Sequence, residues 1–302
     1  MLSVLPGSLP IYSRYPLLNP RLPPLDSEER FARLDRHRIH TTLYVTLAAA
    51  SWSKMSGVVC AWASLPDEVL EWYETEFLPQ QRNVEAQHSI HCEVTASGME
   101  HEPVGKLDAA WPFLTVYEVK DVAQTNREID IASNDLPEAA KSGPLKHVNF
   151  DVRSYREVKR WQNEDFEGNG SADIEHIASI AAMEWTIDEA REEEVLKYYY
   201  EVVGPTISSS PDVLRFRLFK LDRAVVVDRD QKRTFLDSKG LHRYFTLVEL
   251  ESEEWPWDVV VDIAEKPGWA EYFETQTVVK WQLSHYLTRS TFWEHKEKSS
   301  IS

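Results

Sequence analysis

The chain has 302 residues, of which 42% are hydrophobic and 27% are charged, which are the proportions of a globular protein. Its length suits two domains of ordinary size, each able to bury a core of its own. The formal net charge of −17 argues against a nucleic-acid partner, because the phosphate backbone would be repelled. No stretch offers the roughly 20 apolar residues of a membrane-spanning helix, so no membrane partner is expected.

Residues 1–54 are expected to form a leader that is partly disordered. Six prolines between Pro6 and Pro24 interrupt the continuous apolar segment that a signal peptide needs. The same prolines disfavour the amphipathic helix of a transit peptide. The sequence therefore predicts that the leader adds little to the stability of the fold.

A first folded unit is predicted over residues 55–162. The apolar run Val58–Ala63 indicates a buried strand. The segment Ser64-Leu65-Pro66-Asp67-Glu68 then supplies a candidate N-cap, a proline and two acids, which together begin a helix that ends before Pro79. The unit continues with strands at 88–94, 113–119 and 148–158 and a weakly helical stretch at 122–140.

A second unit is predicted over residues 173–292, after a polar, glycine-containing linker at 163–172 and before a polar tail at 293–302. It repeats the order of the first unit. The predicted strands are 177–185, 213–221, 244–250 and 278–287, and the predicted helices are 188–203 and 257–273.

One segment of the sequence occurs twice. Leu70–Pro79 aligns without a gap with Leu196–Pro205, and Phe113–Val119 aligns with Tyr244–Leu250. The repeat distance, roughly 126 residues, is that of a duplicated small domain and not of a solenoid. Each unit therefore has the order β-α-β-β-α-β of a ferredoxin-like fold, which leaves one sheet face in need of cover.

The predicted fold class is α+β, with two tandem ferredoxin-like units packed sheet to sheet as an intramolecular dimeric α/β barrel. Each unit would supply the sheet partner of the other, so a monomer is expected. The two cysteines, Cys60 and Cys92, fall in predicted strands and are too few for a disulfide framework. A reducing compartment, the cytoplasm, is therefore expected.

The residues of the first helix resemble the dimeric α/β-barrel superfamily, in particular tandem, mostly fungal EthD-like proteins. Trp72, Tyr73, Glu76 and Pro79 match that family's Trp-Tyr-x-x-Glu-His-x-Pro pattern. The phrase Phe113-Leu114-Thr115-Val116-Tyr117 is similar to the family's Leu-Ala-Val-Tyr. Tyr155 and Trp281-Gln282-Leu283, in the closing strands, are similar too.

The resemblance implies a small apolar or aromatic ligand of polyketide type and a cofactor-independent reaction, such as cyclisation or oxygenation. No cofactor is expected. The family histidine, however, is replaced by Phe77 in the first unit and by Val203 in the second. The alternative is therefore a non-catalytic binding or scaffold protein that has lost the family histidines.

Glu76 and His88 are the candidate catalytic residues. The helical spacing places Glu76 on the stripe that packs Trp72 against the sheet, where desolvation would raise the pKa of the carboxyl toward that of a general base. Alternatively, Glu76 lies at the edge of the stripe and pairs with Arg82. His88, on the next strand, could donate a proton opposite Glu76, or it could be a core histidine held by hydrogen bonds.

A metal site at His88 and His91 is not expected, because a spacing of three on a strand sends the two side chains to opposite faces. His285 is a similar lone histidine that alternates with Trp281 and Leu283. No phosphate-binding loop, nucleophile elbow or HExxH helix is present. The motifs therefore indicate neither a nucleotide enzyme nor a metalloenzyme of a standard kind.

The candidate substrate-binding residues are aromatic. They are Trp72, Tyr73, Tyr117 and Tyr199. Tyrosine can donate a hydrogen bond or stack on an aromatic ligand, although helix packing explains the run Tyr198–Tyr200 equally well. Because Val202 and Val203 stand where the first unit has Glu76 and Phe77, the functional pocket is expected in the first unit. Arg215 and Arg217 share a strand face and could bind an anion or pair with glutamates.

Overall fold

The computed structural model describes residues 56–80, 86–95, 107–132, 143–166, 168, 171–230 and 232–293. The expectations for the leader and for the tail beyond Trp293 fall outside these ranges. Within them, no helix combines the length and the apolar character that crossing a membrane requires.

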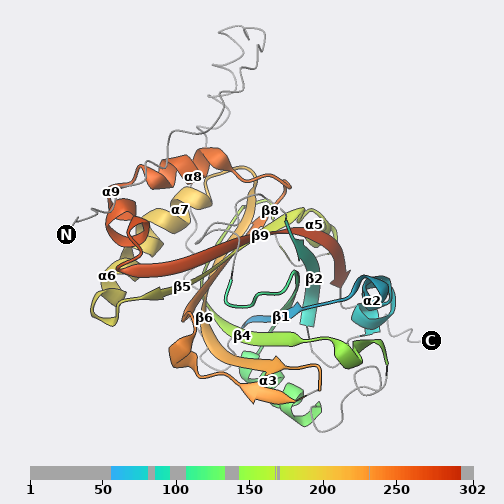
Figure 1. Ribbon diagram of the computed structural model, residues 1–302. Coiled ribbons are helices and arrows are strands. Elements are labelled where there is room, and N and C mark those ends of the chain that lie inside the picture. Colours follow the sequence, from blue (N-terminus) through green and yellow to red (C-terminus); the bar gives the residue numbers. More distant parts are fainter. Residues whose placement is uncertain are drawn as a thin grey trace, which may run out of the picture. The chain divides into compact units, whose positions relative to one another are not determined.

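The described residues form one antiparallel sheet of nine strands, eight of which close into a barrel (Figure 1). The order around the sheet is β4-β1-β3-β2-β9-β5-β8-β6-β7, and pairing of β4 with β6 closes the ring. The strands are β1 (Gly57–Ala63), β2 (Ala86–Val94), β3 (Phe113–Val119), β4 (Phe150–Gln162), β5 (Ser179–Ile187), β6 (Val213–Val227), β7 (Arg233–Phe235), β8 (Tyr244–Leu250) and β9 (Val279–Trp293). The predicted α+β class and the dimeric α/β-barrel architecture are confirmed.

The two halves of the barrel join along strand edges. The first half has the order β4-β1-β3-β2, and the second has β9-β5-β8-β6. Hydrogen bonding of β2 to β9, with His88 opposite Trp293, makes one junction. The long pairing of β4 with β6, from Phe150–Val227 to Gln162–Arg215, makes the other. The expected packing of sheet on sheet therefore takes the form of a closed ring of strands.

Short helices cover the outer face of the barrel. Those of the first half are α2 (Asp67–Trp72), η1 (Tyr73–Phe77), η2 (Leu78–Gln80), α3 (Val122–Ala132) and η3 (Pro144–His147). The later ones are α5 (Ser171–Glu175), η4 (Glu189–Arg191), α6 (Glu192–Tyr198), η5 (Tyr199–Val203), α7 (Gly204–Ile207), η6 (Ser238–Gly240), α8 (Trp257–Ala264), α9 (Pro267–Trp269) and η7 (Ala270–Glu274). In Figure 1, α6 to α9 gather beside β5 and β9.

The first helix of each half has the same irregularity. An α-helical start gives way to a π-helix, at Tyr73–Phe77 in the first half and at Tyr199–Val203 in the second. Both segments lie inside the two aligned stretches of sequence. Since π-helices are rare and frequently mark functional positions, the repeated sequence specifies a repeated and unusual local structure.

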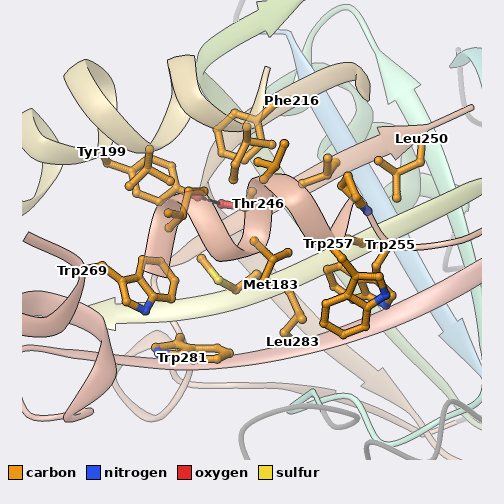
Figure 2. Close-up of a pocket in the computed structure, with 18 residues that line it drawn as sticks. Met183, Tyr199, Phe216, Thr246, Leu250, Trp255, Trp257, Trp269, Trp281 and Leu283 are labelled. Carbon is orange, nitrogen blue, oxygen red and sulfur yellow. Dashed lines mark hydrogen bonds between the residues drawn. The ribbon is translucent and has the colours of Figure 1, made fainter. Parts of the chain in front are cut away.

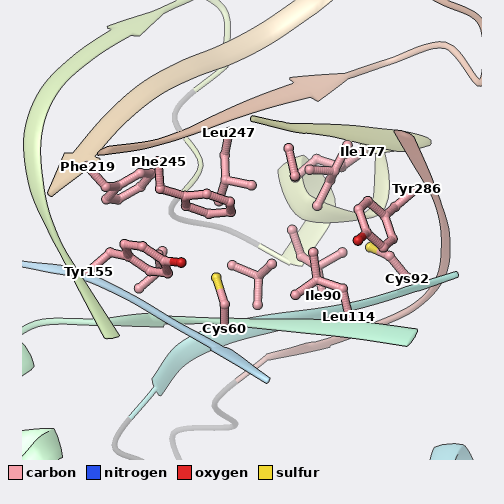
Figure 3. Packing of buried hydrophobic residues seen from close by; sticks show 14 of the residues in the cluster. Cys60, Ile90, Cys92, Leu114, Tyr155, Ile177, Phe219, Phe245, Leu247 and Tyr286 are labelled. Carbon is pink, nitrogen blue, oxygen red and sulfur yellow. The ribbon is translucent and has the colours of Figure 1, made fainter. Parts of the chain in front are cut away.

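The barrel interior is filled with apolar side chains (Figure 3). Val58, Cys60 and Trp62 alternate along β1 and point inward, as the period of two of a strand requires. Tyr155 and Phe245 stack at 4.5 Å between ring centroids. Cys60 and Cys92 are free, buried thiols in this core, and burial raises the pKa of Cys92 to about 12.

Buried ion pairs lie beyond this apolar core. Glu249 accepts hydrogen bonds from Arg215 and Arg217, which also contact Glu118. Arg153 is bonded to Asp151 and Glu184, and all three are at least 95% buried. The alternative that Arg215 and Arg217 pair with glutamates is therefore confirmed.

The segment predicted as a linker is partly built into the barrel. Phe166 is 4% exposed, belongs to the interior cluster and lies 5.5 Å from the guanidinium of Arg215. Gly168 has a φ of 66°, a left-handed conformation that a side chain would strain. Composition indicated a polar connection, and it could not show that one aromatic ring anchors it.

Candidate functional site

A cavity of about 200 Å³ lies between the outer face of the second half of the barrel and the helices that cover it (Figure 2). The strand side is built by alternation. Ala181 and Met183 project from β5, while Thr246, Val248 and Leu250 project from β8. Successive inward neighbours of these residues fill the barrel core. The strands therefore present a continuous apolar floor to the helices.

The roof of the cavity comes from helical spacing. Tyr199, Val203 and Ile207 follow one another at intervals of four and lie on one face of η5 and α7. From α8, Val259 and Ile263 turn inward and are 6% and 5% exposed. The roof is thus two short helical segments that lean on the sheet by apolar contacts.

Four tryptophans surround the cavity. Trp255 and Trp257 flank Pro256, with ring centroids 6.4 Å apart. Trp269 and Trp281 are 6.3 Å apart, and the indole N–H of Trp281 donates to the carbonyl of Phe273 at 2.9 Å. Trp257 is 52% exposed although it also lines the cavity. The mouth of the cavity is therefore at Trp257.

The polar atoms in the floor form one hydrogen-bonded cluster. The hydroxyl of Tyr199 lies 2.6 Å from that of Thr246, and the indole N–H of Trp185 donates to Thr246 at 3.1 Å. Burial raises the pKa of Tyr199 well above its usual range. No acidic, basic or histidine side chain belongs to the 18 residues that line the cavity. The cavity can therefore take an uncharged group and offer it one hydroxyl pair.

Two nitrogen atoms at the Trp255 end have no hydrogen-bond partner within the described part of the chain. They are Nε1 of Trp255 and Nε2 of His285. The two rings are in contact, with centroids 5.0 Å apart. Burial lowers the pKa of His285 to about 4, so the imidazole is neutral at pH 7. Unpaired buried polar groups are costly, which marks this end as a place for a hydrogen-bonding ligand atom or a water.

The register of the strands explains why the cavity lies in the second half. In the first half, Val59 on β1 pairs with Tyr117 on β3. The matching pair on β5 and β8 is Ala181 and Val248. The second half therefore has two smaller side chains at the same place, and the missing volume helps to leave the cavity open.

The expectation that Glu76 is desolvated is wrong. Glu76 is exposed on η1, while its neighbours Tyr73 and Leu78 are buried. The π-helix changes the angular spacing of the stripe, so the regular interval of four from Trp72 no longer brings Glu76 inward. A catalytic role for Glu76 remains a prediction from the sequence.

His88 does not lie opposite Glu76 in a pocket. Its side chain is inside the barrel, with Nε2 3.3 Å from Glu118 and its ring stacked on Trp293 at 5.8 Å. Burial lowers the pKa of His88 to about 4. The sheet separates His88 from the helix that carries Glu76. His88 thus follows the alternative of a core histidine, and its catalytic role is untested.

His91 points to the other face, as the spacing of three predicts. Its Nδ1 lies 2.9 Å from the hydroxyl of Thr115 and its Nε2 lies 3.6 Å from Glu74. The opposite orientation of His88 and His91 is therefore confirmed, and the two cannot share a metal ion.

One of the four predicted substrate-binding residues, Tyr199, lines the cavity. Tyr73 is buried in the first half, where its ring lies 5.2 Å from Phe77 and 5.4 Å from His91. Tyr117 is also buried, and Trp72 packs on Phe77 at 5.6 Å. Binding roles for Trp72, Tyr73 and Tyr117 stay predictions, as does the expectation of a functional pocket in the first half.

One group of three possible metal ligands occurs among the described residues at the other end of the barrel. Atoms of Asp108, Glu184 and His242 lie within 4.8 Å of one another. The guanidinium of Arg153 is 2.6 Å from Glu184 and 3.7 Å from Asp108, so a cation already stands among the carboxylates. We assign no metal to this cluster.

Sequence reasoning missed the tryptophans of the cavity. Trp255, Trp257, Trp269 and Trp281 fall within 27 residues of a chain that has 11 tryptophans in all. This concentration was an available signal. Its meaning depended on knowing that α8, α9 and β9 converge over β5.

No known protein family matches the sequence, and no curated protein does so significantly. Solved structures do match. An anthrone oxidase-like protein superposes with a TM-score of 0.50 at 11% identity, covering 83% of this chain and 98% of its own. A candidate monooxygenase from Lactobacillus acidophilus gives a TM-score of 0.44 at 10% identity, covering 80% and 97%. A chlorite dismutase mutant from Candidatus Nitrospira defluvii gives 0.41 at 9%, covering 78% and 91%. The likeness to the first of these shows that the chain has the fold of the dimeric α/β-barrel superfamily.

Proposed function

We propose that this chain binds a small apolar or aromatic molecule in the cavity of its second half. The observation that carries the proposal is the lining, which is aliphatic and aromatic throughout and contains four tryptophans around about 200 Å³. An apolar cavity of about 150 Å³ in another protein stays dry and binds benzene. A cavity of this size and chemistry therefore suits a ligand of one or two rings.

The finer assignment is to EthD-like proteins that arose by tandem duplication of a ferredoxin-like unit. Its support is the same relative strand order in both halves and the paired π-helices in the aligned segments. The closed ring of strands within one chain supports a monomer, which light scattering on the purified protein would test. A polyketide-type ligand from secondary metabolism is part of the same proposal.

If the protein is an enzyme, the reaction is a cofactor-independent cyclisation or oxygenation. The polar cluster of Tyr199 and Thr246 is the group in the cavity that could hold a ligand oxygen. In an oxygenation, dioxygen would convert a CH₂ group of the ligand to C=O with release of water. The shared fold with the anthrone oxidase-like protein is in keeping with such a role.

A non-catalytic binding protein is the second candidate. The observation that favours it is the absence of any acidic, basic or histidine side chain from the 18 lining residues. General acid–base catalysis needs such a group within hydrogen-bond reach. In this case, chemistry would depend on the ligand's own reactivity and on the exclusion of water.

Native mass spectrometry of the protein purified from its source tests the binding proposal. We expect a co-purifying small molecule with the wild-type chain and none with Val248→Tyr, which fills the cavity. Incubating the released ligand with protein under air then separates the two candidates. A product with an added oxygen or a lost water indicates an enzyme, and an unchanged ligand indicates a binding protein. A ligand retained equally by Val248→Tyr would contradict the assignment of the cavity.

A further inference from the structure

The mouth of the cavity has a charge pattern that its interior lacks. Trp257 and Val260 both line the cavity and reach solvent, at 52% and 38% exposure, and Val261 beside them is 55% exposed. These residues form an apolar rim on α8. A ligand that enters the cavity therefore passes along this helix.

Acidic side chains surround the rim. Between residues 251 and 265 the chain has six exposed carboxylates and no lysine or arginine. They are Glu251, Glu253, Glu254, Asp258, Asp262 and Glu265. The next basic residue, Lys266, is engaged by Asp262 at 2.9 Å. The potential at the mouth is therefore strongly negative, whereas the lining behind it carries no charge.

This arrangement discriminates between ligands of equal size by their charge. A charged group cannot enter the uncharged lining without losing its hydration, so it must remain at the mouth. There, an anion meets six carboxylates, while a cation meets those carboxylates and the faces of Trp255 and Trp257. Tryptophan faces attract cations with about 0.5–1 kcal/mol at exposed sites.

We propose that the cavity is selective for lipophilic amines, which are ligands with an apolar ring body and one protonated amine at the mouth. This proposal rests on the proposed function, because it assumes that the cavity is the binding site. It adds the ligand class: neutral ring compounds bind, cationic ones bind more tightly, and carboxylates of the same shape are rejected.

Three probes that share the naphthalene ring test the proposal by equilibrium dialysis. They are 1-naphthylmethylamine as the cation, 1-naphthalenemethanol as the neutral compound and 1-naphthaleneacetate as the anion. At low ionic strength and pH 7, we expect the cation to bind about tenfold more tightly than the anion, with the alcohol between them. The difference should shrink to about twofold in 0.5 M salt, where exposed charges are screened.

Charge variants connect the selectivity to the mouth. The double variant Glu254→Gln/Asp258→Asn removes two exposed carboxylates beside Trp255 and Trp257, and we expect it to cut the cation preference about threefold while leaving the alcohol unchanged. The control Asp165→Asn/Asp230→Asn changes the net charge equally through exposed residues that do not line the cavity, and it should keep the preference.

The outcomes separate the two proposals. If the alcohol binds but the three probes bind alike, or if the anion binds most tightly, the charge selectivity is wrong and the proposed function stands. An equal loss of preference in both double variants also overturns the role of the mouth. If no probe binds, the proposed function fails, and the selectivity fails with it.

Discussion

Ala181 pairs with Val248 across β5 and β8, and both side chains line the cavity of the second half. Their counterparts in the first half are Val59 and Tyr117. The two halves thus share a register and differ in side-chain volume. This difference suggests how one fold, used twice, can have a binding cavity on one side and a packed core on the other.

The variant Val248→Tyr copies the first half and should close the cavity. We expect loss of naphthalenemethanol binding by at least tenfold, with an unfolding midpoint within a few degrees of the wild type, because the new ring occupies existing space. Equilibrium dialysis and thermal unfolding measure the two effects. The conservative change Val248→Ile is the control and should retain binding. Tight binding by Val248→Tyr would place the ligand elsewhere.

The matched changes Tyr199→Phe and Tyr73→Phe test the polar cluster. Each removes one buried hydroxyl at an equivalent position, and each should cost about 0.5–1.5 kcal/mol of unfolding free energy. Only Tyr199→Phe should alter ligand affinity, because Tyr199 is the one that lines the cavity. Sequence reasoning gives the reverse expectation, with a near-neutral effect at Tyr199. Unchanged affinity in Tyr199→Phe would support that earlier reasoning.

Arg153 should be essential to the closed barrel. It is 1% exposed and bonded to Asp151 and Glu184, so Arg153→Met leaves two buried carboxylates without their cation. Breaking a buried pair in this way costs about 3–5 kcal/mol. Urea unfolding should show this loss, while Arg191→Met, which removes a surface pair with Glu194, should leave the midpoint nearly unchanged. Similar midpoints for the two variants would contradict the importance of the buried pair.

Gly204 allows α7 to approach the barrel closely. A Cβ atom at this position would lie 2.3 Å from the ring of Trp161, whereas at Gly240 it would meet nothing within 4 Å. We expect Gly204→Ala to lower the unfolding free energy by about 1–3 kcal/mol through forced repacking, and Gly240→Ala to have little effect. Equal thermal midpoints for the two variants would mean that the Trp161 contact is not maintained in solution.

Stability should fall between about pH 6.5 and pH 4 because three histidines are buried in neutral form. Burial lowers the pKa of His88, His91 and His285 to about 4. Over this range the unfolded chain binds protons that the folded chain does not, so acid favours unfolding by on the order of 1–3 kcal/mol per histidine.

Urea unfolding at pH 7 and at pH 4.5 measures this effect. His285→Gln should reduce the difference between the two pH values, and His176→Gln, at an exposed position, should not. Glu249 acts lower on the pH scale. Arg215 and Arg217 hold its pKa at about 2 against the effect of burial, so the stability it contributes is lost only below about pH 4. A flat profile from pH 7 to pH 4.5 would show that the histidines are accessible to protons in the folded protein.

The sequence by itself determined the strands and the order of the fold. Alternation in Val58–Ala63 and the aligned phrases Phe113–Val119 and Tyr244–Leu250 are local patterns, and local backbone geometry is enough to interpret them. The opposite orientation of His88 and His91 likewise follows from the period of a strand. Such features depend only on neighbours along the chain, which is why they could be predicted.

Only the tertiary structure decided the site. Glu76 was expected to be buried because its spacing assumed an α-helix throughout, and the π-helix at Tyr73–Phe77 removed that basis. The cavity arises where Ala181, Val248 and the distant tryptophans converge, and these are brought together by strand pairing and helix packing over long sequence separations. Empty volume is a property of the whole packing and not of any one segment, so no pattern along the chain could reveal it.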